Sequence, residues 1–388
     1  MEINIKNPNA LEMKSENQRT LLNILRRRST SRADLAEQLH LTRSCITFLV
    51  DDLMERGLLR ETVTKGTGVG RPPVMLEIVP EARVVGGVNI RRSSTSVGFV
   101  NLAGETLIEE EISNEGIPAE QQLCRIGEIL LCQQKALAVP DEMVLGVGLC
   151  APGPLDFRTG CLLTPPNFPG WRHVPAADIL SRETGFSVYA ENVSGAMALR
   201  EWFFGAAREM NHFMVMQINE GIGAGVVTGG SLYRGANGLG CEIGHATIQL
   251  NGRPCACGNR GCLEAYAAIP ALLKDTPFSC WEEVVSRAET DAQARALIDE
   301  EAGYLSAAIV SAINLFDLEN IILMGDVAAR PGRLAPLIEK TVSGCVIAHG
   351  SGPSAAISFD DRSMPVCDGA MACLYAFFVT EPQRSRLS

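Results

Sequence analysis

Three cysteines and one histidine have the spacing of metal ligands. Cys255, Cys257 and Cys262 lie within eight residues, and His245 lies ten residues before the first of them. Three thiolates and an imidazole fill the tetrahedral coordination of a structural Zn²⁺ and leave no position open for water. The alternative is a set of buried or free thiols. We expect the other ten cysteines, which lack this spacing, to be core residues of that kind.

A second group of side chains has the hydrogen-bonding character that base recognition requires. Thr42, Arg43, Ser44 and Thr47 lie at the start of a segment whose apolar residues recur at helical spacing. The apolar positions are Ile46, Leu49, Val50 and Leu53. This period predicts an amphipathic helix that buries the apolar stripe and leaves the four polar side chains off its buried side.

The elements around this helix are those of a helix-turn-helix. Apolar residues between positions 18 and 25 predict a first helix, and Ser31 with Asp34 forms the capping box of a second. Residues 40–42 form a short turn, and Gly57 ends the third helix. In this arrangement the second helix of the motif lies in the major groove of double-stranded DNA, with its first residues at the base edges.

A glycine-rich hairpin follows and has the character of a wing. Residues 58–63 and 74–78 are predicted strands, and the segment 65–73 between them holds three glycines and Arg71. Arg71 can enter a narrow, A·T-rich minor groove. The alternative is a protein-binding three-helix domain with a solvated hairpin. No aromatic platform accompanies the basic residues, which disfavours single-strand binding.

Length and composition indicate a soluble globular protein of two or three domains. The chain has 388 residues, of which 46% are hydrophobic and 20% are charged. These values exclude collagen-like, coiled-coil and wholly disordered chains. The sequence contains no apolar run of the ~18 residues that a membrane span needs, and no charged start leads into a short apolar core of the kind expected in a signal peptide. We expect no membrane insertion and a cytoplasmic location.

The net charge of −11 is unevenly distributed. Residues 1–72 carry twelve Lys and Arg against nine Asp and Glu, which makes this segment +3 and leaves the rest of the chain at −14. An acidic body repels polyanions, so contact with nucleic acid is expected from the basic head.

The remainder of the chain alternates predicted strands and helices, which indicates an α/β body of two lobes. Expected strands are 84–100 (two strands joined by a turn at 91–94), 105–112, 144–149, 213–218, 222–227 and 321–324, and expected helices lie near 121–137, 193–204 and 292–315. We place a winged helix-turn-helix domain at 1–80 and the body at 81–388. Lobe one then covers about 81–192 plus the C-terminal helix, and lobe two about 193–366.

The body resembles the ROK family, which comprises repressors, uncharacterised proteins and sugar kinases with an actin/hexokinase-like fold. The resemblance rests on the segment 242–245, on the cysteine-rich segment 255–264, and on glycines at 221, 223, 225, 235 and 244. Together with the winged head it covers nearly the whole chain and implies the repressor branch.

This resemblance implies sugar recognition at five positions, which are Asn167, Asn192, Glu242, His245 and Glu264. Amides and carboxylates form directional bonds that distinguish one hydroxyl pattern from another. His245 is also a metal ligand in this interpretation, since a zinc-bound imidazole can still donate from its other nitrogen. The structural alternatives are a turn residue at Asn167 and a helix N-cap at Asn192.

The departures from the family kinases imply that catalysis has been lost. The phosphate loop of those kinases, Asp-x-Gly-Gly-Thr, is here Asn89-Ile90-Arg91-Arg92-Ser93. Where those kinases have a catalytic Asn-Asp pair, this chain has Asn192-Val193, and valine cannot accept a proton. Where those kinases have a Gly-Gly pair near the nucleotide, this chain has Gly325-Asp326. We expect no catalytic residues, no enzyme activity and no ATP.

The expected function is that of a sugar-responsive transcriptional repressor of carbohydrate uptake or catabolism genes. It would bind a two-fold operator as a homodimer or dimer of dimers. The alternatives are a sugar kinase with a DNA-binding head, and a regulator controlled by a protein partner such as a transport component.

Arg91 and Arg92 have two interpretations. Two guanidinium groups where kinases hold the transferred phosphoryl group favour an anion, so the effector could be a sugar phosphate. Alternatively, the arginines pair with acidic neighbours such as Asp326 and close an inactive nucleotide site.

Overall fold

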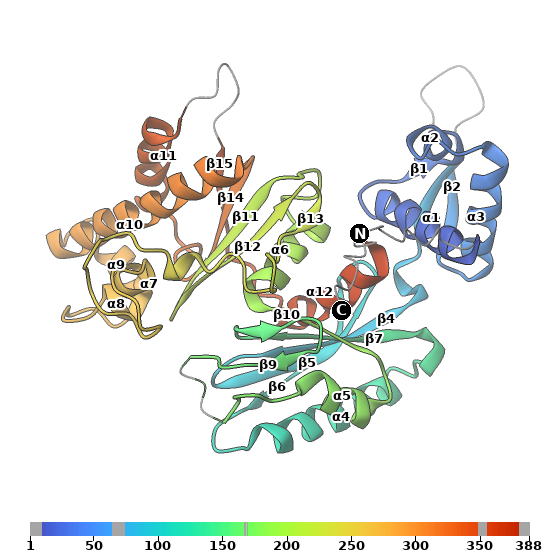
Figure 1. Cartoon of the computed structure of the whole chain (residues 1–388), viewed down its shortest axis with the longest axis horizontal. Coiled ribbons are helices and arrows are strands. Elements are labelled where there is room, and N and C mark those ends of the chain that lie inside the picture. Colours follow the sequence, from blue (N-terminus) through green and yellow to red (C-terminus); the bar gives the residue numbers. More distant parts are fainter. Residues whose placement is uncertain (1–9, 64–73, 167, 169, 348–354, 380–388) are drawn as a thin grey trace, which may run out of the picture.

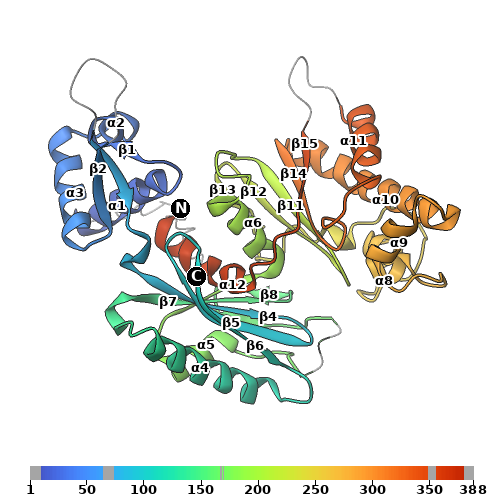
Figure 2. The same cartoon turned by 180° about the vertical axis from the view of Figure 1, so that it is seen from behind.

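The computed structural model describes residues 10–63, 74–166, 168, 170–347 and 355–379, which form a small head and a two-lobed α/β body (Figures 1 and 2). The head contains α1 (Ala10–Leu25), β1 (Thr30–Ser31), α2 (Arg32–Gln38), α3 (Arg43–Glu55), β2 (Leu59–Val63) and β3 (Val74–Ile78).

A local hydrogen bond fixes the start of the second helix of the head. The Ser31 side chain caps α2 by accepting a hydrogen bond from the Asp34 backbone N–H, as the capping box predicts. The predicted stripe of α3 is buried against Leu21 and Leu35. The first helix begins at Ala10, earlier than predicted. Its first turns bury no apolar side chains, so they show no apolar pattern in the sequence. Instead, the Lys14 Nζ lies 2.6 Å from the Asp52 carboxylate on α3.

The two predicted strands of the wing pair antiparallel, with Val63 opposite Val74, and β1 adds a third strand beside β3. Residues 64–73 connect the paired ends. Arg71 lies outside the described residues.

Lobe one is a five-stranded sheet with helices on both faces. In the order β10-β7-β4-β5-β6, its strands are β10 (Val188–Asn192), β7 (Val144–Ala151), β4 (Val84–Ile90), β5 (Ser94–Asn101) and β6 (Thr106–Ser113). The helices α4 (Ala119–Ala136) and α5 (Ala176–Thr184) cover one face, and α12 (Pro365–Phe378) covers the other (Figure 1). A Cβ at Gly148 on β7 would collide with the Gly369 carbonyl, so this glycine lets α12 lie directly on the sheet.

Lobe two is a second five-stranded sheet in the order β13-β12-β11-β14-β15. Its strands are β11 (Phe213–Ile218), β12 (Ile222–Thr228), β13 (Ser231–Leu232), β14 (Asn320–Gly325) and β15 (Ala356–Asp360), and its helices are α6 (Val193–Phe204), α7 (Glu264–Ala267), α8 (Ile269–Leu272), α9 (Trp281–Arg287), α10 (Ala292–Phe316) and α11 (Leu334–Cys345). The strand β11 is apolar on both sides because Val215 packs in the cluster that contains α6 and Met216 packs in the cluster that contains α10.

The helix α6 lies against β12 at very short range, and the glycines of β12 permit this. A Cβ at Gly225 would collide with the backbone carbonyl of Ser194 and with the Ala198 methyl group. The family glycine run therefore has a packing reason here, since it brings the start of α6 onto the sheet.

The structure confirms the α/β class, and each strand and helix that the sequence predicted in the body is present within a few residues. The sequence analysis did not identify β10 and β15. Both lie at sheet edges and have mixed sequences, so they lack the apolar run of a central strand. Among the described helices none is long and apolar enough to cross a membrane.

The packing of α6 gives a stability prediction. Gly225→Ala should destabilise the chain by about 1–3 kcal/mol, because the added methyl group meets a backbone carbonyl that cannot move alone. Gly303→Ala is the matched control. It lies at an exposed position within α10 with open space around it, and should stabilise by about 0.5–1 kcal/mol. Urea unfolding measures both, and equal effects of the two changes would contradict the packing argument.

Candidate functional site

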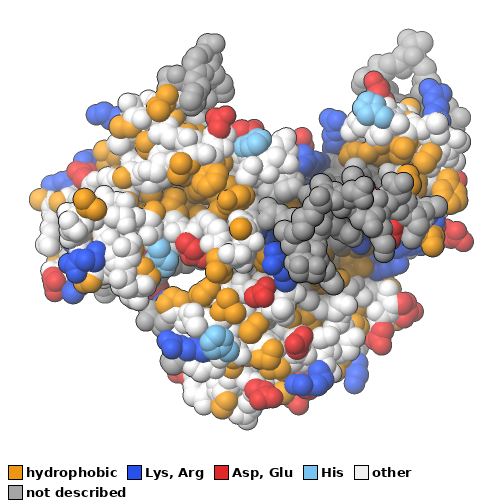
Figure 3. Space-filling model, in the orientation of Figure 1, with side chains coloured by type: hydrophobic (Ala, Val, Ile, Leu, Met, Phe, Trp, Pro, Cys, Tyr) orange, Lys and Arg blue, Asp and Glu red, His pale blue; other side chains and the backbone are white. Residues whose placement is uncertain are grey.

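An open cleft of about 1090 Å³ separates the two lobes, and Figure 3 shows the hollow where they meet. Five parallel strands, β4, β7, β10, β11 and β14, end at this cleft. The residues that follow them, Arg91, Pro152, Val193, Asn219 and Asp326, all line it. Ligands of α/β sheets bind outside the carboxyl ends of parallel strands, so the topology itself indicates a ligand site here.

Asn192 lies at the end of β10 and has two roles. Its Oδ1 accepts a hydrogen bond of 2.7 Å from the Gly195 N–H and so caps α6, as the structural alternative proposed. The residue also lines the cleft, and its Nδ2 group is left to donate to a ligand. The two interpretations of Asn192 are therefore compatible. Asn167, the other predicted amide, lies outside the described residues.

Glu242, His245 and Glu264 line the cleft from lobe two. Glu242 precedes the 3₁₀ turn Ile243–His245, and Glu264 begins α7. The Glu264 Oε2 accepts a hydrogen bond of 3.0 Å from the Ile222 N–H, which fixes this carboxylate. Burial raises the pKa of Glu242, the nearby His245 lowers it, and the charge of Glu264 raises it further. The three side chains thus form a compact set of polar groups.

Arg91 and Arg92 also line the cleft, and each has an acidic partner. The Arg91 Nη2 lies 2.6 Å from the Glu111 carboxylate, and the Arg92 Nη1 lies 2.7 Å from that of Glu220. The named candidate partner, Asp326, is paired with neither in the described contacts. Because Glu220 belongs to lobe two, the Arg92 ion pair spans the mouth of the cleft.

Of the other positions that differ from the family kinases, Val193 and Asp326 line the same cleft and Asn89 does not. Val193 is the first residue of α6 and presents a hydrocarbon side chain to the cleft. Asp326 follows β14, and burial together with the charge of Glu220 raises the pKa of its carboxyl group. Asn89 lies in β4 and is 5% exposed.

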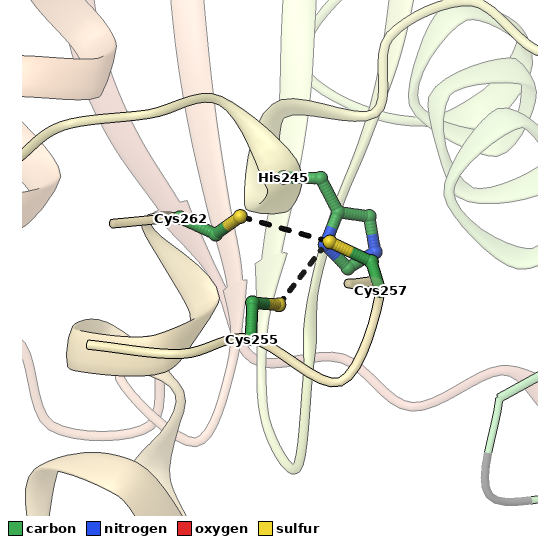
Figure 4. Close-up of side chains that lie close together, drawn as sticks. All are labelled: His245, Cys255, Cys257 and Cys262. Carbon is green, nitrogen blue, oxygen red and sulfur yellow. Dashed lines mark hydrogen bonds between the residues drawn. The ribbon is translucent and has the colours of Figure 1, made fainter. Parts of the chain in front are cut away.

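The four predicted metal ligands converge on one point beside the cleft (Figure 4). Their ligand atoms all lie within 4.8 Å of one another. The Cys255 Sγ lies 3.7 Å from the His245 Nδ1, and the Cys257 Sγ lies 3.7 Å from the Cys262 Sγ. These residues can hold a metal ion.

In the head, the four predicted polar residues lie together on the exposed side of α3. Thr42 caps the helix by accepting from the Cys45 N–H at 3.2 Å, and the Thr47 Oγ1 donates to the Arg43 carbonyl at 2.9 Å. Thr42, Arg43, Ser44 and Thr47 are all exposed. Phe48 lies beside them with 60% of its surface exposed, and the sequence analysis missed it.

The sequence analysis also missed several polar residues that line the cleft. These are Thr164, Arg172, Ser194, Gln217 and Asn219. Asn219 could have been identified because it directly follows a predicted parallel strand. Thr164 and Arg172 lie in an irregular segment whose path no local pattern predicts.

A head of three helices and a small sheet on a two-lobed body with an interlobe cleft defines a protein with a sugar-kinase-like fold and an additional N-terminal domain. The chain belongs to the ROK family, whose sequence profile matches residues 85–363. The family resemblance found in the sequence is therefore confirmed.

Individual proteins of this family are similar over most of the chain. The xylose repressor of Bacillus spizizenii is 29% identical over 321 residues, which cover 81% of this chain and 83% of that protein. The glucokinase of Thermotoga maritima is 32% identical over 289 residues, or 68% of this chain and 88% of the kinase. A crystal structure of a ROK family transcriptional regulator, a homologue of the Escherichia coli MLC protein, matches with a TM-score of 0.79. It is 24% identical and covers 94% of this chain and 98% of its own. That structure supports the fold of head and body together.

Proposed function

We propose that this protein is a sugar-responsive transcriptional repressor. The observation that carries the proposal is the combination, in one chain, of an exposed polar recognition face on α3 with a polar interlobe cleft. The similarity to a xylose repressor, which extends over 81% of the chain, supports the same assignment.

We propose that the effector is a sugar held in the cleft. Asn192, Glu242, His245 and Glu264, with Asn167, would bind its hydroxyl groups. Carboxylates and amides on two sides of the cleft offer both donors and acceptors, as a hydroxyl-rich ligand requires. The other candidate is a regulator whose body binds a transport protein. In that case these side chains would have no role.

We propose that the cleft does not transfer phosphate. A kinase is the second candidate function, because a glucokinase is 32% identical over 68% of the chain. Val193 argues against it, since a hydrocarbon at the position of the family base cannot accept the proton of a sugar hydroxyl. Arg91, Arg92 and Asp326 further replace the groups that approach the nucleotide in family kinases. We expect no ATP binding.

We propose that the metal ion is a structural zinc held by His245, Cys255, Cys257 and Cys262. Sulfur ligands ~2.3 Å from a tetrahedral zinc lie ~3.8 Å apart, and the Cys257 and Cys262 sulfur atoms are 3.7 Å apart. The His245 Nδ1 faces the sulfur atoms, which leaves its Nε2 available to a hydroxyl group. The zinc would brace the loop that carries Glu242 and Glu264.

We propose that Thr42, Arg43, Ser44 and Thr47 contact base edges of an operator and that Arg71 enters the minor groove. One head offers one recognition helix, so a homodimer or dimer of dimers would bind two half-sites.

The first prediction concerns operator recognition. Duplexes selected from a random pool by the full chain should contain two symmetry-related half-sites with A·T-rich sequence near each wing. Arg43→Ala should weaken binding by about fivefold or more and relax selectivity at one base pair, because it removes a base contact worth about 1–3 kcal/mol. Arg125→Ala, an exposed arginine on α4, is the control and should leave affinity unchanged. A single unpaired half-site bound by a monomer would contradict the dimer.

A second prediction concerns the effector's charge. Because Glu111 and Glu220 already neutralise Arg91 and Arg92, we expect calorimetry to give affinities for D-glucose and D-glucose 6-phosphate within about threefold of each other. The double variant Arg91→Ala/Arg92→Ala should not alter this ratio. A strong preference for the phosphate that disappears in the double variant would instead establish the anion-binding interpretation.

The metal assignment makes a third prediction. Mass spectrometry should find about one zinc per chain in protein purified without chelator. Cys257→Ser should lower this content and the thermal stabilisation by sugar together, while the head keeps its helical structure. Cys132→Ser, at an exposed cysteine on α4, is the control. Wild-type protein free of zinc would overturn the assignment.

A further inference from the structure

The helix α6 reaches from the cleft to the head. Its first residues, Val193 and Ser194, line the cleft, directly after the cap residue Asn192. The helix is twelve residues, or about 18 Å, long and ends in Trp202, Phe203 and Phe204. The first half of the helix has small side chains that allow close packing, whereas the last turn has three aromatic rings.

The last turn of α6 holds an arginine of the head. We call Trp202 and Phe203 the aromatic socket. The guanidinium carbon of Arg26, the first residue after α1, lies 3.8 Å from the centre of the Phe203 ring and 4.5 Å from that of Trp202. Its Nη1 donates to the Trp202 carbonyl at 3.1 Å, and only 8% of the residue is exposed. Burial lowers the pKa of Arg26 to about 9, so it remains a cation at neutral pH.

The contact also runs in the opposite direction. Arg208, just beyond the end of α6, donates from its Nη2 to the carbonyl oxygens of Arg26 and Arg27, at 3.0 and 3.3 Å. Leu21, Leu22 and Leu25 of α1 belong to the same apolar cluster as the socket and α12. The end of α1 is therefore fixed to the end of α6 by stacking, by hydrogen bonds from both sides and by a shared core.

The middle of α6 is held by buried charges. Arg200 lies 2.9 Å from the Asp368 carboxylate on α12 and 3.4 Å from that of Asp360 at the end of β15, and it is almost completely buried. Together with the close packing of Ser194 on Gly225, these contacts attach the start and the middle of the helix to both lobes.

A second line of contacts runs beside the helix. The Glu191 carboxylate accepts from the Asn192 backbone N–H at 3.0 Å and from the Arg234 Nε at 2.7 Å. The Arg234 guanidinium lies 5.3 Å from the Tyr375 ring, which packs 6.3 Å from that of Trp202. This line joins the same two ends, the cap of α6 and the aromatic socket.

We propose that α6 is the element that couples the cleft to the head, and that Arg26 in the aromatic socket is the residue through which the head follows it. The proposal rests on the proposed function, because it assigns the route by which a ligand in the cleft changes operator binding. A ligand bound at Asn192 shifts the first turn of α6, and the socket carries the shift to α1. The coupling is reciprocal, so releasing the head must loosen the cleft end of the helix.

Because the coupling is reciprocal, it can be tested without sugar or DNA. A negative result would then argue against the coupling through α6 and not against the proposed function. Hydrogen exchange is measured on the full chain, on Arg26→Met and on the control Arg28→Met, which removes the same charge from an exposed side chain two residues away. Exchange in α10 serves as the internal reference for global stability.

In Arg26→Met we expect amides 195–199, at the cleft end of α6, to exchange at least threefold faster relative to α10. Arg28→Met should match the wild type. Should Arg26→Met fail to fold, Arg26→Lys, which keeps the charge and loses the planar stacking group, should show the same change at smaller size. Faster exchange confined to residues 200–208 and α1 would mean that Arg26 only anchors the head, and would overturn the proposal.

Discussion

The convergence of the carboxyl ends of five parallel strands on one cleft is the constraint on which the rest of the molecule depends. The sheets need only their apolar faces, so the residues just after each strand are free to change. Arg91, Val193 and Asp326 occupy three such positions. A cleft of the kinase type can therefore change at these positions and keep its shape and its other polar side chains.

The same geometry explains why α6 has a central place. It starts at a strand end in the cleft, crosses between the two sheets, and ends under the head. Its glycine-mediated contact with β12 and the buried Arg200 tie it to both lobes. The Arg92–Glu220 ion pair adds a link across the mouth of the cleft. In our proposal these features allow a fold that transfers phosphate in kinases to respond to a ligand bound in the cleft.

The parts that the sequence predicts are those with local causes. The capping box at Ser31, the stripe of α3 and the Cys₃His spacing depend on neighbours within one or two turns or a short loop. The edge strands β10 and β15 escaped because their mixed sequences lack the apolar run of a central strand. The contact of Arg26 with Trp202 spans 176 residues, and the partner of Arg92 lies 128 residues away. No periodicity marks such pairs, so only the folded chain reveals them.

The central claim is that the cleft binds a sugar and affects DNA binding without turning the sugar over. One experiment tests both halves. The full chain is titrated with its selected operator duplex in the presence of Mg²⁺ and ATP, with and without each member of a panel of neutral pentoses and hexoses that includes D-xylose and D-glucose, and ATP consumption is followed in the same samples. We predict that at least one sugar changes the operator affinity fivefold or more, with no ATP consumed above the protein-free rate. Sugar-dependent ATP consumption, or an operator affinity that no sugar in the panel alters, would contradict the account.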